Sequence, residues 1–390
     1  MNRREFLRNM CVGGIATFAL PRVTFAQVNQ GGRLVFVLLR GGFDGLAAVV
    51  PYGDPRYESL RGSLAFHTAD LFELTDLFAL APGLAPLREA WQHNELLVVH
   101  AMAIPYRTRS HFDGQAILET GLDHPEGSSD GWLNRLLQVM NGKRSGIAIA
   151  AGMPRSMSGP FDVQTWSPAQ LGNVDDAYLE RLAVLYRTDP ALQDHFEAAL
   201  QQQVTVGEEP MAARGARRGG ITPIMRATAR ILRQDEGPNI AAMEFSGWDT
   251  HANQGLVGGP LDRLLGQLAE GLMVLRTDMG TAWANTTVVV MTEFGRTARP
   301  NGTRGTDHGT AGAGFVMGPT VARSAVLSDW PGLDDRSLFE GRDLRPHTRA
   351  GRPRVPGLGC GARGLRHDAL GEVASLGCAP GPPRAIFPPC

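Results

Sequence analysis

Acidic and histidine side chains follow three apolar runs of the sequence. The stretches are Arg40–Asp44, Trp248–His251, and Glu293–Arg296 followed by Thr306–His308. Because parallel strands place their carboxyl ends along one edge of a sheet, side chains far apart in the chain can meet there. Carboxylates and imidazoles that meet in this way can bind a divalent cation and support hydrolysis. The sequence therefore predicts a metal site at the strand ends.

The candidate ligands differ in how strongly their surroundings favour a metal. Asp249 and His251 form an Asp-x-His pair that can direct an oxygen and a nitrogen at one cation, with an Asx turn and a surface histidine as the alternative. Asp307 and His308 are adjacent before a small-residue turn, so both can serve one site. Asp44 follows a glycine turn and is either a ligand or the N-cap of a helix.

Glu293 ends a strongly apolar run, where burial of a carboxylate is costly unless a cation or an arginine meets it. A metal ion is one such partner, and a structural salt bridge to Arg296 is the other. Gln254 is expected to orient Asp249 or His251 from behind.

Ser110 stands directly before a predicted helix, where free N–H groups favour an anion and a nearby metal ion would activate the hydroxyl as a nucleophile. Arg107 and Arg109 are candidates to clamp the oxygens of a phosphate or sulfate. The alternative is that Ser110 only caps the helix.

Short apolar runs alternate with helical patterns along the chain. The runs predict strands over Leu34–Leu39, Leu96–Ala101, Gly146–Ala150, Ile240–Phe245, Thr286–Thr292 and Gly314–Met317. The helical patterns span Leu84–Gln92, His111–Thr120, Asp175–Gln203, Ile221–Arg233 and Leu261–Met279. This alternation predicts an α/β fold with a mostly parallel central sheet covered by helices on both faces.

Composition and charge exclude some classes of protein. The 390 residues are 43% hydrophobic and 20% charged, which is typical of a globular chain. The 38 Lys and Arg residues nearly cancel the 39 Asp and Glu residues, so nothing indicates a nucleic-acid partner. Of four cysteines, Cys11 lies near the N-terminus and the others lie at or beyond Cys360, which excludes a cysteine nucleophile or thiolate zinc site in the body.

Residues 1–26 are predicted to be a twin-arginine signal peptide. Arg3 and Arg4 precede a modestly apolar run from Cys11 to Leu20, and Ala26 ends a small-residue cleavage site. The run falls well short of the roughly 20 apolar residues that span a bilayer, so no stable membrane span is expected. The predicted partner is the twin-arginine export machinery, and the predicted location is periplasmic or secreted.

The remaining chain divides into a predicted α/β domain over residues 27–346 and an atypical tail over 347–390. The tail is rich in Gly, Pro and Arg and holds the last three cysteines. Such a composition without a period indicates a disordered or non-native segment, such as one produced by a frameshift near His347. A natural low-complexity tail is the alternative.

Five motifs together resemble one family over roughly residues 1 to 346, namely the exported bacterial proteins known as domain of unknown function 1501. They are Arg40–Leu46, Arg109–Phe112, Gly247–His251, Thr292–Thr297 and Thr306–Thr310. The family is similar in turn to the alkaline phosphatase and sulfatase superfamily. The resemblance implies an alkaline-phosphatase-like three-layer sandwich with one or two divalent metal ions, either Zn, Mn, Mg or Ca.

The resemblance also implies roles for individual residues. Ser110 matches a nucleophile, and Asp249, His251 and His308 match the ligands of one metal. A second metal would take Asp44, Ser110 and an Asp-His pair, where this chain has Glu293 and Phe294, so Asp307 would have to complete that site. The implied function is hydrolysis of a small anionic phosphate or sulfate ester. The alternative is a non-catalytic exported protein that binds an envelope component.

Overall fold

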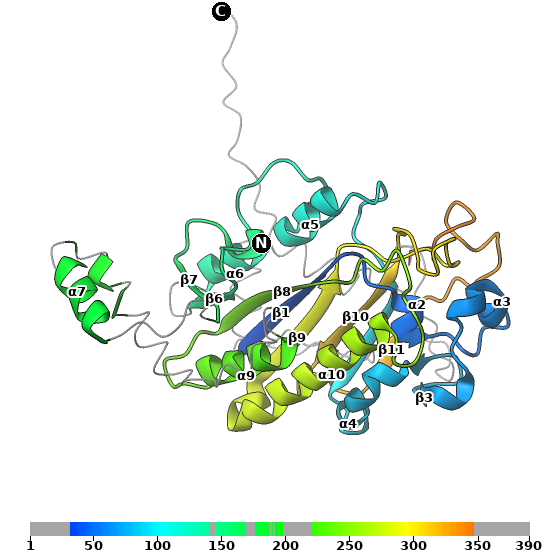
Figure 1. Cartoon of the computed structure of the whole chain (residues 1–390), viewed down its shortest axis with the longest axis horizontal. Helices are drawn as coiled ribbons and strands as arrows, with labels where there is room; N and C mark the ends of the chain where they lie inside the picture. The colour runs from blue at the N-terminus through cyan, green and yellow to red at the C-terminus, as the bar shows by residue number, and fades with distance from the viewer. Residues whose placement is uncertain are drawn as a thin grey trace, which may run out of the picture.

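A computed structural model describes residues 32–140, 145–168, 176–186, 189, 192–194, 196–197 and 220–346. Its main feature is an eight-stranded sheet in the order β11-β5-β10-β9-β1-β8-β6-β7 (Figure 1). The strands are β1 (Arg33–Arg40), β5 (Leu96–Met102), β6 (Gly146–Ile149), β7 (Val163–Trp166), β8 (Ile240–Ser246), β9 (Thr286–Thr292), β10 (Gly312–Met317) and β11 (Ala325–Leu327). The predicted signal peptide and the predicted tail lie outside the described residues.

The sheet is mostly parallel, as predicted. β1 pairs in parallel with both β8 and β9, and only β10 runs antiparallel to its neighbours β5 and β9. A small second sheet joins β2 (Val49–Val50), β4 (Ala79–Leu80) and β3 (Phe72–Glu73). The central position of β1 explains its unbroken apolar sequence, because a strand covered on both faces needs no polar alternation.

Helices cover both faces of the large sheet (Figure 1). The described α-helices are α2 (Gly45–Ala48), α3 (Tyr57–Arg61), α4 (Arg88–Gln92), α5 (His111–Thr120), α6 (Trp132–Val139), α7 (Asp176–Tyr186), α9 (Ile221–Leu232) and α10 (Pro260–Asp278), of which α7 lies apart from the sheet. Val35 and Val37 of β1 share one core cluster with α9 and α10, whereas Phe36 and Leu38 share the other with α5 and α6. The predicted three-layer α/β arrangement is therefore confirmed.

Two predicted helices are wrong in part. The helix predicted over Asp175–Gln203 is described as α7, which ends at Tyr186, and Asp189 is not helical, while residues 198–203 lie outside the described part of the chain. Leu84–Gln92 is not a single α-helix, because the 3-10 helix η3 (Pro82–Leu87) precedes α4. Pro86 lies inside η3 and has no N–H to donate, which weakens α-helical pairing there. Four more 3-10 turns complete the described elements: η1 (Gly62–Leu64), η2 (Thr68–Asp70), η4 (Arg155–Met157) and η5 (Gly280–Asn285).

In the part of the chain that the structure describes, no helix is long and apolar enough to cross a membrane.

His100 makes the fold sensitive to acid. Its ring is buried in β5, where Nε2 lies 2.8 Å from the Val49 carbonyl oxygen and Nδ1 accepts a hydrogen bond from the Ala101 amide. Burial lowers the pKa of His100 from 6.5 to about 4. The folded chain therefore resists a proton that the unfolded chain accepts, and stability is lost as the pH falls from 6.5 towards 4, by up to roughly 3 kcal/mol.

Urea unfolding at pH 7 and pH 4.5 measures this loss of unfolding free energy. His100→Gln keeps a hydrogen-bond donor but does not titrate, so it is expected to reduce the difference in unfolding free energy between the two pH values. His93→Gln is the matched control, because His93 is exposed. An unchanged pH dependence in His100→Gln would contradict the assignment.

Candidate metal centre

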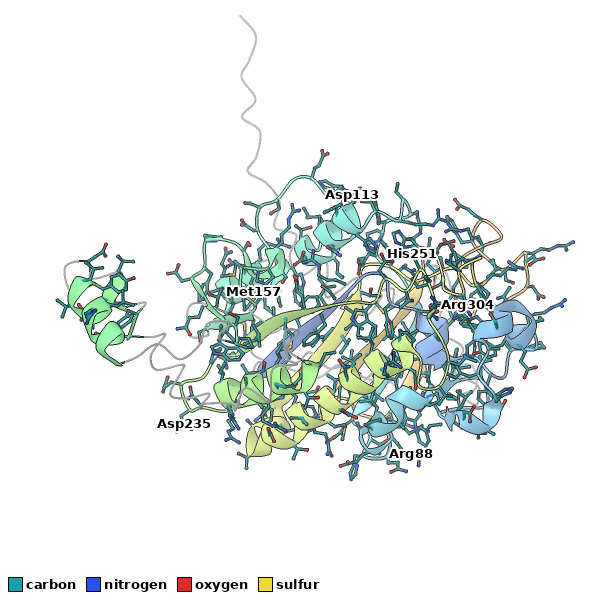
Figure 2. The ribbon with its side chains drawn as sticks, viewed as in Figure 1. Arg88, Asp113, Met157, Asp235, His251 and Arg304 are labelled. Carbon is teal, nitrogen blue, oxygen red and sulfur yellow. The ribbon has the colours of Figure 1, made fainter. Side chains whose placement is uncertain are left out.

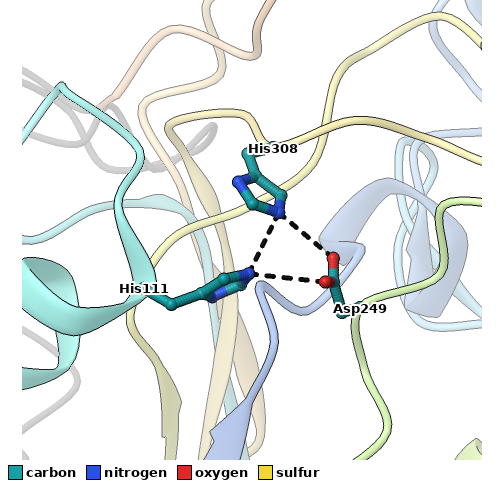
Figure 3. A group of neighbouring side chains, drawn as sticks. All are labelled: His111, Asp249 and His308. Atoms are coloured by element: carbon teal, nitrogen blue, oxygen red, sulfur yellow. Dashed lines mark hydrogen bonds and ion pairs between the residues drawn. The ribbon is translucent and has the colours of Figure 1, made fainter.

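Three histidines and one aspartate meet at the carboxyl ends of the central strands. His111 Nε2 lies 3.0 Å from His308 Nε2 and 3.5 Å from Asp249 Oδ2, as Figure 3 shows. His251 Nε2 lies 3.0 Å from His308 Nε2 and 2.9 Å from Asp249 Oδ1. His111, Asp249 and His308 each offer one ligand atom within 4.8 Å of the others, which is close enough to hold a metal ion.

Separate segments of the chain deliver these side chains. His111 is the first residue of α5, Asp249 and His251 follow β8, and His308 lies before β10. The loop after β8 is fixed to the loop before β10, because the Thr306 amide donates to the Thr250 carbonyl. Figure 2 shows His251 at this end of the sheet, where the Gln254 amide also donates to the carbonyl of Arg304.

Two consecutive glycines bring β1 up to the centre. Gly41 has φ +128°, and a Cβ there would lie 2.5 Å from the Asp249 amide nitrogen. Gly42 has φ +74°, and a Cβ there would lie 2.6 Å from the Phe294 ring. Only glycine fits both the backbone conformation and these approaches, so the pair sets the turn against which Asp249 packs.

Each of the three imidazoles is anchored through its other nitrogen. His111 Nδ1 lies 2.8 Å from Glu293 Oε1, and His251 Nδ1 lies 3.2 Å from Asp307 Oδ1. His308 Nδ1 lies 3.0 Å from the carbonyl oxygen of Arg109. All three partners are acceptors, so each ring donates its Nδ1–H and leaves a lone pair on Nε2.

This tautomer pattern fits a cation. Three neighbouring Nε2 lone pairs repel one another unless a proton or a metal ion lies among them. Histidines that ligate a metal ordinarily donate their other N–H to a carboxylate or a backbone carbonyl, which is the arrangement of all three rings here. The donor set of His111, His308 and Asp249, with His251 next to it, therefore fits a divalent metal ion.

The charges around the centre keep its acids ionised. The hydrogen bond to Glu293 raises the pKa of His111. Burial works to raise the pKa of Glu293, but its hydrogen bonds with His111 and Gln115 outweigh burial and lower it. Burial lowers the pKa of His308, and the charge of neighbouring His111 adds to that effect. The three rings thus lie beside the carboxylates of Asp249, Glu293 and Asp307, and an arginine pairs with the first of these.

The arginine is Arg296, which is buried and donates to Asp249 Oδ1. It also donates to the carbonyl of Gly41 and to Thr306 Oγ1, 3.1 Å away. Burial works to raise the pKa of Asp249, but the hydrogen bond and charge of Arg296 outweigh it and lower that pKa. Arg296 therefore partners Asp249 and not Glu293, so the salt bridge considered for Glu293 from the sequence is wrong.

The structure does not bring every predicted site residue to the donor cluster. Asp44 is buried and caps α2, accepting from the Ala47 amide at 3.2 Å. Gln254 donates to Asp44 Oδ2 at 2.8 Å, so it orients Asp44 and not the ligands for which the sequence suggested it. Glu293 and Asp307 contact Nδ1 of His111 and of His251, on the side of each ring that faces away from the centre.

The predicted nucleophile and its two arginines lie beside the centre with other partners. Ser110 is the N-cap of α5, and its Oγ accepts from the Asp113 amide at 3.5 Å, the weak limit of a hydrogen bond. Arg107 donates to the carbonyls of Ile104 and Tyr106. Arg109 pairs with Asp343 at 2.8 Å and with Glu340. The catalytic roles of these three residues stay predictions.

His111 is the member of the centre that sequence reasoning missed. It stands next to Ser110 in the Arg-Ser-His-Phe motif, where the start of a helix favours an anion and therefore indicated the serine. The available signal was that the first residue of a helix begun at a sheet edge points its side chain back towards that edge.

Comparison with known protein families gives one match. Residues 85–344 match the family described as protein of unknown function (DUF1501). The chain belongs to this family. The matched DUF1501 segment contains all four donors of the centre, together with Glu293 and Asp307. No curated protein sequence matches this DUF1501 chain.

Two solved structures are similar to this DUF1501 protein. One is the C-terminal periplasmic domain of EcEptC from Escherichia coli in complex with Zn, with 11% identity, 74% of each chain covered and a TM-score of 0.34. The other is the phosphonate monoester hydrolase of Agrobacterium radiobacter, with 11% identity, 78% of this chain and 73% of that chain covered, and a TM-score of 0.29. Because the sequence identities and TM-scores are this low, the activity of the DUF1501 chain has to be argued from its own residues.

Proposed function

We propose that this DUF1501 protein is a metal-dependent hydrolase of small phosphate or sulfate esters. The observation that carries the proposal is the convergence of three Nδ1-anchored histidines with Asp249. His111, His251, His308 and Asp249 would hold the ion. When bound, it would polarise the ester and stabilise the negative charge that develops on its oxygens.

The exposure of the four donors supports a catalytic centre over a purely structural one. Their side chains are 25–45% accessible. Structural metal sites are closed by protein ligands, whereas catalytic sites leave a position open for substrate. An external ester can therefore reach the donors.

Ser110 is the proposed nucleophile. Its Oγ would form a bond to phosphorus or sulfur while the bond to the leaving alcohol breaks, and the serine proton would end on that alcohol. Water would then release the inorganic anion and restore the serine. The long contact from the Asp113 amide leaves the hydroxyl weakly held, which suits this role.

The test separates the chemistry of Ser110 from its part in capping α5. The zinc-loaded chain is assayed with an aryl phosphate and an aryl sulfate, and Ser110→Ala is compared with Ser110→Asn, which keeps a capping side chain. We expect both variants to lose turnover while both retain the metal. Turnover that survives in both variants would overturn the nucleophile.

A second candidate function is a non-catalytic exported protein that binds an envelope component. The observation that favours it is that Arg107 and Arg109, the predicted anion clamp, are occupied by backbone carbonyls and by two carboxylates. A metal-loaded chain that turns over neither ester would support this function.

Export is part of the same proposal. Residues 1–26 would direct the chain to the twin-arginine machinery, residues 27–346 would form the exported α/β domain, and residues 347–390 would remain a separate tail. Cell fractionation of the full chain and of an Arg3→Lys, Arg4→Lys variant tests the route. We expect the variant to stay in the cytoplasm.

A further inference from the structure

The number of metal ions depends on carboxylates beyond Asp249. A second ion beside the first would need its own ligands, and three other acids lie close enough to be considered: Asp44, Glu293 and Asp307. Each of them is already committed to a different partner in the described structure.

Asp44 is matched by an internal cation. Arg61 Nη2 lies 2.7 Å from Asp44 Oδ2, and the two side chains are 0% and 1% accessible. Gln254 Nε2 donates to the same oxygen, and the Ala47 amide donates to the other. Both oxygens of this carboxylate are therefore occupied, and its charge is already balanced by the guanidinium.

Gln254 links the Asp44–Arg61 pair to the centre through hydrogen bonds, since its amide group donates to Asp44 and its carbonyl oxygen accepts from two threonines. Its Oε1 accepts from Thr250 Oγ1 at 2.7 Å and from Thr306 Oγ1 at 2.9 Å. Thr306 Oγ1 in turn accepts from Arg296, which donates to Asp249. Asp44 therefore acts on the centre through this chain of contacts and not as a ligand.

Glu293 and Asp307 are committed to the histidines. Glu293 is fully buried, and its Oε1 accepts from Gly41, from Gln115 and from His111. Asp307 Oδ1 faces His251 Nδ1 and accepts from Asn301 Nδ2 at 3.0 Å. If a metal ion bound to Glu293 or to Asp307, the histidine beside that acid would lose the acceptor that holds its proton on Nδ1.

Phe294 fills the remaining space. Its ring centroid lies 4.8 Å from that of His111 and 5.2 Å from that of His308, and it contacts the Gly42 turn. An apolar ring at this place offers no ligand atom and packs beneath the two imidazoles. On the side of the centre that faces the Gly42 turn, Phe294 therefore supplies packing and no ligand for a second ion.

We infer that the centre binds a single transition-metal ion on His111, His251, His308 and Asp249, with Asp44, Glu293 and Asp307 as positioning residues. This inference rests on the proposed metal-binding function. Three imidazole nitrogens favour ions such as Zn²⁺ over Mg²⁺ and Ca²⁺, which prefer oxygen ligands.

Metal counting tests the inference without any assay of activity. The full chain is stripped with a chelator, incubated separately with Zn²⁺, Mg²⁺ or Ca²⁺, freed of unbound ion and analysed by elemental mass spectrometry. We expect one zinc per chain and less than a tenth of that amount of magnesium or calcium. Titration with Co²⁺, followed by its visible spectrum, is expected to end at one equivalent in the unmodified chain.

Two variants sharpen the count. Asp44→Asn keeps the cap of α2 and is expected to retain one zinc per chain, whereas Glu293→Gln is expected to retain one zinc with about 10- to 100-fold weaker affinity. Two ions per unmodified chain, one of which is lost in Asp44→Asn, would overturn the inference while leaving the proposed function intact. No bound ion in the unmodified chain would overturn both. The cobalt end point decides the number even if a variant fails to fold.

Discussion

His308→Ala is expected to release the metal ion and to abolish ester hydrolysis. His308 Nε2 is the only donor atom with short contacts to His111, His251 and Asp249 alike, at 3.0, 3.0 and 3.2 Å. Loss of a residue that only orients a ligand costs about 10- to 100-fold in affinity or activity. Loss of this central donor is expected to exceed that range in both quantities.

Zinc content and aryl-ester turnover measure the two effects in the same sample. The matched control is His124→Ala, because His124 is an exposed histidine that contacts Asp123, outside the centre. The control is expected to keep one zinc and full turnover. Retention of stoichiometric zinc in His308→Ala would show that the ion binds elsewhere.

Arg61→Met is expected to destabilise the fold by about 3–5 kcal/mol. The substitution keeps an unbranched apolar stem but leaves the carboxylate of Asp44 buried without a counter-ion. It also removes the donor that lies 3.4 and 3.3 Å from the carbonyls of Thr297 and Ala298. Breaking one half of a buried pair is costly because the other charge remains desolvated.

Urea unfolding of the single and double variants isolates the pair. Asp44→Asn combined with Arg61→Met is expected to be more stable than Arg61→Met alone, because no uncompensated charge remains. The matched control is Arg56→Met, whose partner Asp334 is 64% accessible and whose own side chain is 63% accessible. An exposed pair of this kind contributes about 0–1 kcal/mol. Equal losses in Arg61→Met and Arg56→Met would contradict the buried counter-ion.

Most of the sheet was predictable from the sequence. The strand Thr286–Thr292 and the helix His111–Thr120 are observed with the predicted bounds, because continuous β-branched runs and a Ser N-cap are local signals. The direction of β10 was not predictable, since an apolar run looks the same in either orientation. Short edge strands such as β11 were missed because they bury too little to leave a pattern.

The site was predictable as a location more than as a set of roles. Asp249, His251 and His308 meet as expected, because their positions after strands fix the edge of the sheet to which they belong. The division between ligands and supporting acids was not readable, since Glu293 directly follows β9 as a ligand could, and Asp307 is the sequence neighbour of the donor His308. The orientation of the His111 and His251 rings makes the distinction, because each ring turns Nε2 towards the centre and Nδ1 towards its supporting acid. The prediction of Arg107 and Arg109 as a clamp did not include their local partners, which lie in the backbone and in Glu340 and Asp343.

The spacing of the donors along the chain makes the metal a late cross-link. His111 and His308 are 197 residues apart, and His251 and His308 are 57 apart. Under the proposed metal binding, a high-affinity site would not exist until β1, β8 and β9 have paired and α5 has docked, so the ion would select chains that have completed their longest-range contacts. The bound ion would close loops that the polypeptide alone holds with hydrogen bonds, and the unfolding rate of the metal-bound chain would then be tied to the dissociation of one ion.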